Sequence, residues 1–297
     1  MKPSPISPRT ATLLAAETDT NTLPAVLPQL SHLLSHSPNL QQAFLSHPST
    51  PQVWKIFPTE GQWCGYRNLQ MLLLALPSVL PATSPVLREP EFLKTKFTIP
   101  QLQSLIESAW TQGFNAHSRD QLGGRLVGTT TFIGTPEAEA LLLSLGVPCT
   151  GHVFKGPEAW IELLDSVEEY FSSSCALSAP PDGKAVKAIS DETPLKCEGN
   201  GGSVISTTRP PIFLQRPGHS ITIIGLSRST SGKRHLLVFD PAWSPPSALR
   251  RRGGGGNEAP TCGECEGWAA KWMLRQYRKG GRYLGRWREF ETVSVDW

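Results

Sequence analysis

Cys64 lies where the sequence changes from a turn-rich segment to an apolar helix. Leucines spaced three and four apart over residues 69–76 predict that this helix starts near Cys64 and ends before Pro77. At a helix N-terminus, the dipole and the unbonded backbone N–H groups favour the thiolate, which is the nucleophilic form of cysteine. Gly65 follows and would let a substrate backbone approach closely. Taken alone, a cysteine before an apolar helix is more often a small core residue.

His219 and Asp240 are of the residue types that a thiol nucleophile needs beside it. His219 opens the run HSITIIGL and Asp240 ends the run HLLVFD, and both runs are predicted strands joined by a turn at SRSTSGK. Because neighbouring antiparallel strands place the start of one beside the end of the next, the carboxylate could orient the imidazole that takes the thiol proton. Each residue alone fits a turn or a strand end, but their joint placement with Cys64 favours nucleophilic catalysis by a cysteine.

The elements that must position these residues follow from hydrophobic periodicity and from turn signals. Helices precede a late antiparallel sheet, which predicts an α+β fold rather than alternating βαβ units. Besides the Cys64 helix, the predicted helices cover parts of residues 22–47 and residues 100–113, 135–145, 157–171 and 268–277. Further predicted strands are residues 147–154, residues 212–215 and the final run ETVSVDW.

Glycine and proline divide the 297-residue chain into a core and two insertions. The chain has 26 glycines and 27 prolines, about 18% of its length, against roughly 12% in an average protein. Nine of them fall in residues 172–211 and nine in residues 244–267. We therefore expect a flexible N-terminal segment at residues 1–21 and a single domain at residues 22–297, with irregular insertions at those two places.

The composition excludes several classes of protein. A net charge of +3 is too small for the electrostatic footprint of a nucleic-acid-binding protein. The apolar runs are much shorter than the roughly 20 residues of a membrane helix, and the N-terminus lacks the apolar core of a secretion signal. We therefore expect neither a nucleic-acid partner nor a membrane partner, and a location in the cytoplasm or the nucleus.

Two pairs of residues have the spacing of metal ligands. Cys262 and Cys265 form a CxxC, half of a zinc site, but no second pair lies beside them, although Cys175 and Cys197 could supply thiolates from separate segments. Solvent-accessible thiols are the favoured interpretation. His32 and His36 lie four residues apart without the glutamate of an HExxH motif, so surface histidines are favoured there. We expect no metal and no cofactor.

The run EGQWCGYRNLQMLL resembles the nucleophile motif of cysteine proteases that cleave ubiquitin-fold modifiers and ubiquitin, the family of the ubiquitin-fold-modifier-specific proteases and the ZUFSP deubiquitinases. The run GHSITIIGL, followed by LLVFDP, is similar to the ZUFSP branch, in which Gly-His precedes Asp-Pro. The modifier proteases carry Asp-Pro-His instead, and this chain lacks that run. The runs FIGTPEAEALLLSLGVP and QYRKGGRYLGRWREFE also resemble family segments, so the resemblance covers residues 45–295 apart from the two insertions.

The resemblance implies a papain-like fold and a role for each residue of the site. Cys64 would be the nucleophile, His219 the general base and Asp240 the residue that orients the base. The family's oxyanion donor precedes the nucleophile by about ten to twelve residues. That spacing implies Gln52, and Gln62 is a rival because it lies close to Cys64 in the sequence.

The resemblance also implies a substrate. The family commonly has Trp-Gly before the nucleophile, whereas this chain has Gln62-Trp63, so the groove entrance is expected to differ. Trp63, Gly218 and Trp243 are expected to wall a narrow channel for the glycine-containing tail of the modifier. The implied activity is a cysteine-type isopeptidase that removes ubiquitin or a ubiquitin-like modifier from proteins or chains. We expect it to act as a monomer.

Two other classes of function remain as alternatives. One is an inactive pseudo-protease that binds ubiquitin or a ubiquitin-like protein, and the intact Cys64, His219 and Asp240 argue against it. The other is nucleic-acid binding by residues 250–252 and the arginines of residues 275–288, which the near-neutral total charge disfavours. A basic surface that faces an acidic or polar partner is the preferred interpretation of these arginines.

Overall fold

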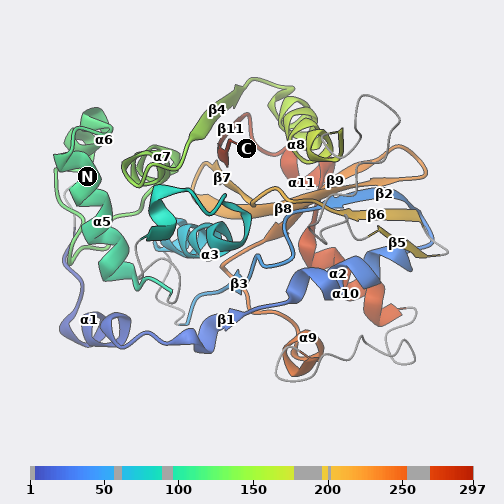
Figure 1. Cartoon of the computed structure of the whole chain (residues 1–297), viewed down its shortest axis with the longest axis horizontal. Helices are drawn as coiled ribbons and strands as arrows, with labels where there is room; N and C mark the ends of the chain where they lie inside the picture. Colours follow the sequence, from blue (N-terminus) through green and yellow to red (C-terminus); the bar gives the residue numbers. More distant parts are fainter. Residues whose placement is uncertain are drawn as a thin grey trace.

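A nine-stranded mixed sheet forms the centre of the computed structural model (Figure 1), which describes residues 4–56, 62–88, 96–176, 196–199, 202–252 and 268–296. Its strands are β2 (Leu40–Leu45), β4 (Cys149–Lys155), β5 (Lys196–Gly199), β6 (Gly202–Ser206), β7 (Ile212–Arg216), β8 (His219–Ser229), β9 (Arg234–Phe239), β10 (Arg278–Gly280) and β11 (Glu289–Val295). Most run in the order β4-β11-β7-β8-β2-β6-β5, while β9 pairs with β8 and β10 pairs with β9. A separate pair joins β1 (Thr22–Leu23) to β3 (Gln52–Val53).

Helices cover both faces of this sheet (Figure 1). The helices are α1 (Pro8–Ala15), α2 (Val26–Ser35), α3 (Cys64–Val79), α5 (Ile99–Thr111), α6 (Ala116–Gln121), α7 (Thr135–Ser144), α8 (Ala159–Ala176), α9 (Ser247–Arg252), α10 (Trp268–Tyr277) and α11 (Gly281–Leu284), with 3₁₀ turns at Asp19–Asn21 and Pro85–Arg88. One buried cluster lies between α8 and the sheet, a second involves α2 and α10, and a third joins α3, α5 and α7. No described helix is long and apolar enough to cross a membrane.

The long strand β8 is the central strand of the sheet. It pairs along one edge with β9, and along the other edge first with β7 and then with β2. His219 is therefore opposite Arg216 at the start of β8, and Asp240 directly follows the last residue of β9. The predicted α+β fold is confirmed, and the helix that begins with Cys64 packs against β8, which pairs antiparallel with β9.

Local sequence signals predicted several helices correctly. The helix predicted over residues 100–113 is α5, and it begins with a capping box in which Thr98 and Gln101 bond each other's backbone N–H groups. The helix predicted at residues 135–145 is α7, and the helix predicted at residues 157–171 is α8. Periodicity and end signals sufficed for these elements because they lie within single segments.

Residues 40–45 differ from the helical expectation for residues 22–47. They form β2, which is inserted in the sheet between β8 and β6, with Ala43 and Leu45 fully buried. The helical spacing holds only for α2, which ends at Ser35. The helix α3 also runs to Val79 rather than ending before Pro77, because the Leu80 N–H still bonds the Leu76 carbonyl at 2.9 Å.

The insertion predicted at residues 172–211 is more regular than expected. The helix α8 extends to Ala176, and β5 and β6 both fall inside the interval. Parallel pairing with β2 holds β6 in the sheet and buries Val204 completely. Residues 177–195 lie outside the described part of the chain. The second interval, residues 244–267, contains α9, and residues 253–267 are also outside the described part.

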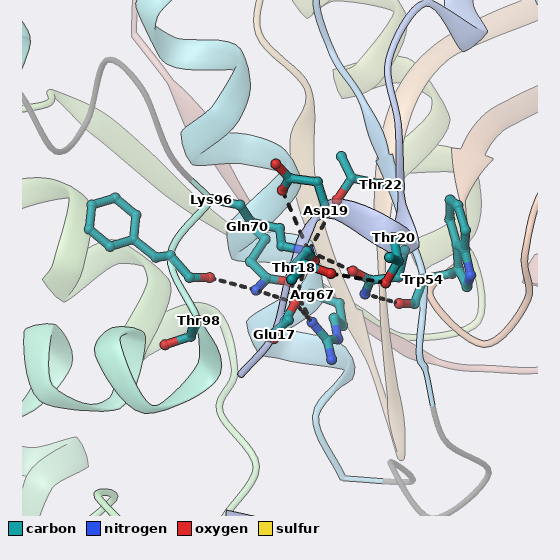
Figure 2. Close-up of polar contacts among 12 residues, drawn as sticks. Glu17, Thr18, Asp19, Thr20, Thr22, Trp54, Arg67, Gln70, Lys96 and Thr98 are labelled. Carbon is teal, nitrogen blue, oxygen red and sulfur yellow. Dashed lines mark hydrogen bonds and ion pairs between the residues drawn. The ribbon is translucent and has the colours of Figure 1, made fainter. Parts of the chain in front are cut away.

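The N-terminal segment, expected to be flexible, is packed against the domain. Its Glu17 is fully buried and forms an ion pair with Arg67, one turn after Cys64 on α3 (Figure 2). The Lys96 ammonium lies 2.9 Å from the same carboxylate and donates to the Thr18 carbonyl at 2.7 Å. The physical reason is that Arg67 is completely buried and its charge needs a counter-charge.

Replacing Glu17→Gln should strongly destabilise the protein, because it leaves the buried charges of Arg67 and Lys96 without their carboxylate. We expect the free energy of unfolding to fall by about 3–5 kcal/mol, measured by urea denaturation. The matched control is Asp19→Asn, since the Asp19 side chain is 80% exposed and 3.9 Å from Lys96. This control should cost at most about 1 kcal/mol. Equal losses for the two variants would contradict the structural role of Glu17.

Candidate active site

Cys64 is the first residue of α3, as the sequence predicts, and it is only 7% exposed. At this position its backbone N–H has no acceptor within the helix and is available to a bound anion. The helix behind it is buried on nearly every side. Cys64 is therefore held by a rigid element, with the positive end of the helix dipole at its thiol.

Gly65 serves the packing of the chain itself rather than the approach of a substrate. A β-carbon at this position would lie 2.6 Å from the carbonyl oxygen of Ile133. Only glycine lets residues 131–134 lie this close to the first turn of α3. The expectation that Gly65 leaves room for a substrate backbone is thus corrected: the space is filled by Ile133.

His219 and Asp240 are brought together as predicted. The His219 Nε2 atom lies 2.8 Å from Asp240 Oδ1, and the two side chains are 15% and 8% exposed. The same carboxylate oxygen accepts the Ala242 backbone N–H at 2.9 Å. Burial would raise the pKa of Asp240, but the bond and charge of His219, with the Ala242 N–H, lower it below its ordinary value. Asp240 is therefore an ionised, fixed partner for the imidazole.

Cys64 and His219 lie close enough that each shifts the pKa of the other. Because Nε2 is occupied by Asp240, the Nδ1 atom is the one left to face the thiol. Burial tends to raise the pKa of Cys64, but hydrogen bonds from His219 and Ser220 outweigh it and lower that pKa to about 7. Burial likewise lowers the pKa of His219, whereas its bonds to Asp240 and Cys64 raise it to about 9. The site therefore favours a thiolate and an imidazolium near neutral pH.

Ser220 is a site residue that the sequence reasoning missed. Both its backbone N–H and its side chain act on the Cys64 thiol, and both lower the pKa of the thiol. The Ser220 hydroxyl is buried and has no hydrogen-bond partner in the described part of the chain, so it is a polar group held near the thiol without a partner of its own. The available signal was a polar residue directly after His219, at the buried start of an otherwise apolar strand.

A cleft of about 340 Å³ opens at the thiol. Its walls come from α6, from residues 132–137, from the end of β7 and from the start of β8. Within the wall, Glu137 is buried, accepts the Gly134 N–H at 2.7 Å and bonds Ser118, so it caps α7. Burial raises the pKa of Glu137. The cleft is thus shaped by fixed groups on one side of Cys64.

The structure brings only one of the three expected groove residues to this cleft. Gly218 lines it, with a φ of +77° that favours glycine just before His219. Trp63 does not line it: its ring is 3% exposed and packs in the core shared with Tyr66. Trp243 is also absent from the lining, because its ring packs against Lys279 and Tyr277 instead. The cleft therefore does not support the groove roles of Trp63 and Trp243, which stay predictions.

The two candidate oxyanion donors lie in different environments. Gln52 is 1% exposed in β3, which packs against α3, and its Oε1 accepts the Tyr277 hydroxyl at 3.0 Å. Gln62 is exposed in the turn before α3. Gln52 does not line the cleft, and its role as an oxyanion donor stays a prediction.

The histidine and cysteine pairs give no metal centre in the described residues, where no cluster of three or more His, Cys, Asp or Glu could hold an ion. His32 is half-buried and His36 exposed, and their rings lie 4.4 Å apart. Cys262 and Cys265 lie outside the described residues, as do the side chains of Cys175 and Cys197.

Comparison with known proteins agrees with this arrangement. The sequence model of Peptidase family C78 matches residues 40–293. The "Zinc finger-containing ubiquitin peptidase 1" proteins of Macaca fascicularis and Homo sapiens are 35% and 34% identical over 187 and 192 residues, which is 61% of this chain and 27% of each relative. The chain thus spans about a quarter of these relatives.

Two further matches come from a shorter protein and from a solved structure. The "Ubiquitin carboxyl-terminal hydrolase mug105" of Schizosaccharomyces pombe is 32% identical over 184 residues, 61% of this chain and 60% of that protein. The crystal structure of UfSP from C. elegans aligns with 99% of this chain and 42% of that chain at a TM-score of 0.49 and 13% identity. With residues 40–293 matched by the family model and the cysteine, histidine and aspartate assembled at one cleft, the chain belongs to Peptidase family C78.

Proposed function

We propose that the protein is a thiol-dependent isopeptidase that removes ubiquitin, or a ubiquitin-like modifier, from proteins or chains. The observation that supports this most is that Cys64 and His219 line one cleft and shift each other's pKa, while His219 is hydrogen-bonded to Asp240. Cysteine proteases need this arrangement of nucleophile, base and orienting carboxylate. The names of the relatives, ubiquitin peptidase and ubiquitin hydrolase, support ubiquitin as the modifier.

The reaction proceeds in two steps. The Cys64 thiolate adds to the carbonyl carbon of the modifier's terminal glycine, and the oxyanion accepts hydrogen bonds from the Cys64 N–H and the Gln52 amide. Protonated His219 gives its proton to the lysine amine as the C–N bond breaks, which leaves a thioester on Cys64. Water then attacks the thioester carbonyl, and His219 takes a proton from the water. The Cys64 thiolate is expelled, and the modifier is released with a free glycine carboxylate.

The substrate class follows from the size of the cleft. A volume of about 340 Å³ at the thiol admits an extended tail without bulky side chains next to the scissile bond. Modifiers that end in glycine present such a tail.

Replacing Cys64→Ala should abolish hydrolysis and covalent labelling by ubiquitin with an electrophilic C-terminus, because the nucleophile is lost. Parallel probes carrying the ubiquitin-fold modifier and other modifiers would identify the preferred one by gel shift. The control is Cys149→Ala, whose thiol is half-buried and has a pKa raised to about 12 by burial. That variant should be labelled like the native protein. Labelling of Cys64→Ala would contradict the assignment, and a native protein that binds but does not react would be a pseudo-protease.

The pH dependence of kcat/KM should be bell-shaped. Activity falls below a pH of about 7, where the Cys64 thiolate is protonated, and falls above about 9, where the His219 imidazolium loses its proton. In Asp240→Asn the charge that raises the pKa of His219 is gone, so the alkaline limb should move to lower pH. Asp240→Ala should keep partial activity, since Asp240 only orients the base. An alkaline limb unchanged in Asp240→Asn would contradict the assignment.

Tyr277 is the anchor of the proposed oxyanion donor. Its hydroxyl donates to Gln52 Oε1 at 3.0 Å, and this fixes the plane of the amide and the direction of its N–H groups. The Tyr277 ring is 1% exposed and packs edge to face on Phe239, directly before Asp240. Tyr277 would thus act on the reaction through Gln52 and would not touch the substrate.

Gln52→Ala should lower kcat by about 10²–10³-fold, the effect of removing one oxyanion donor. Tyr277→Phe removes only the hydroxyl and should lower kcat about fivefold, the equivalent of about 1 kcal/mol, with KM unchanged. Added to Gln52→Ala, Tyr277→Phe should have no further effect on kcat. The control is Tyr170→Phe, which removes a buried hydroxyl that bonds the Pro210 and Val295 carbonyls away from the cleft. Additive losses in the double variant would contradict the coupling.

A further inference from the structure

A second concave region, separate from the cleft, gathers positive charge. This groove of about 1190 Å³ lies between the start of α8, the start of β9, β10 and α11, which contact one another. It shares no lining residue with the cleft at Cys64. Its cationic lining residues are Lys233, Arg234, Arg275, Arg278, Arg282 and Arg286. Because the whole chain carries a net charge of only +3, this is a strong local concentration of charge.

Most of these cations have no counter-charge. Arg234 is neutralised by Asp165 at 2.5 Å and by Glu168 at 3.0 Å, both on α8. Within the described ranges, the other five cations of the groove have no carboxylate within the 4.0 Å of an ion pair. Lys233, Arg275, Arg282 and Arg286 are exposed. The groove is therefore an open surface whose positive charges, except that of Arg234, are not neutralised by ion pairs among the described residues.

Arg278 is the most informative of these cations. Its side chain is half-buried, and its Nε atom is buried with no hydrogen-bond partner among the described residues. Burial lowers the pKa of Arg278, and no carboxylate opposes this effect. Neighbouring His235 also has a lowered pKa, first from burial and then from the charges of Arg278 and Lys233. A guanidinium buried without an acceptor is costly, and an incoming anion would satisfy it.

The aromatic residues of the groove favour a peptide over a nucleic acid. Trp160 packs so closely on Gly281 that a β-carbon there would lie 2.9 Å from its ring. The Tyr283 ring lies 4.9 Å from Trp287 and also contacts Arg216 and Lys279. Both rings are thus engaged and offer no free platform on which bases could stack.

The edge strand gives an extended chain a place to pair. The strand β10 has three residues and pairs only with β9 in the described part of the sheet. Its other edge can accept a backbone in the manner of strand addition. We propose that this groove is a docking site for an extended acidic segment, rich in Asp and Glu, of a partner protein. The segment's carboxylates bind the arginines, and its backbone lies along β10.

The test uses the full chain and a short fluorescein-labelled polyglutamate peptide, with binding followed by fluorescence anisotropy. We expect binding that weakens as salt is raised, and no binding of a neutral glycine–serine peptide of the same length. The double variant Arg282→Glu/Arg286→Glu should weaken binding about tenfold or more. The matched control is Arg9→Glu/Arg250→Glu, which changes the net charge equally at two exposed arginines outside the groove. It should bind like the native protein.

Three outcomes would overturn the proposal. One is the absence of polyglutamate binding at low salt. Another is an equal loss in both double variants, which would mean attraction by net charge alone. The third is tighter binding of an oligothymidylate than of polyglutamate, lost in Arg282→Glu/Arg286→Glu, which would make the groove a nucleic-acid site. Because the groove variant leaves Cys64 untouched, probe labelling reports on the proposed peptidase activity independently of this result.

Discussion

The structure depends on burying α3, the helix that begins with Cys64, although this helix carries polar residues on several sides. Three of them, Arg67, Asn68 and Gln70, are buried at 0%, 0% and 1% exposure, so each must find a partner inside the protein. Arg67 takes Glu17 from the N-terminal segment. Gln70 donates to the Phe97 carbonyl at 2.6 Å. The helix can adopt its position only when these distant segments are in place.

Asn68 makes the connection that matters most for the site. Its Oδ1 accepts the Thr222 hydroxyl at 2.9 Å, which ties α3 to β8. Asn68 lies one helical turn after Cys64, and Thr222 lies three residues after His219. This buried bond, surrounded by apolar packing, therefore fixes the position of Cys64 relative to His219. The contact of Gly65 with Ile133 adds a further fixed point near the start of the helix.

This dependence explains how far the sequence could predict the protein. The start of α3 at Cys64 and the strand pair with His219 and Asp240 follow from periodicity and from the geometry of adjacent strands, both of which are local. The role of Glu17 could not be read locally, because its segment is rich in Ser, Thr and Pro and its partner lies 50 residues away. The sequence did not predict strand β2 for the same reason. Its run LQQAFL has no clear alternation of apolar and polar residues, and pairing with β8 and β6 decides its structure.

The residues from the end of α10 into β10 support the turn beside Asp240 and also line the positively charged groove. Tyr277 and Lys279 hold Trp243, whose N–H bonds the Asp240 carbonyl at 3.3 Å, so they brace the turn that carries the carboxylate. Arg278 lies between them, and successive residues of a strand point to opposite faces. The backbone position of Arg278 is therefore set by its neighbours and not by its own side chain. The Arg278 side chain is half-buried as a result, and its Nε–H donor has no acceptor among the described residues. In the proposed groove, an anionic ligand that bonds this donor would gain more free energy than one that bonds an exposed arginine.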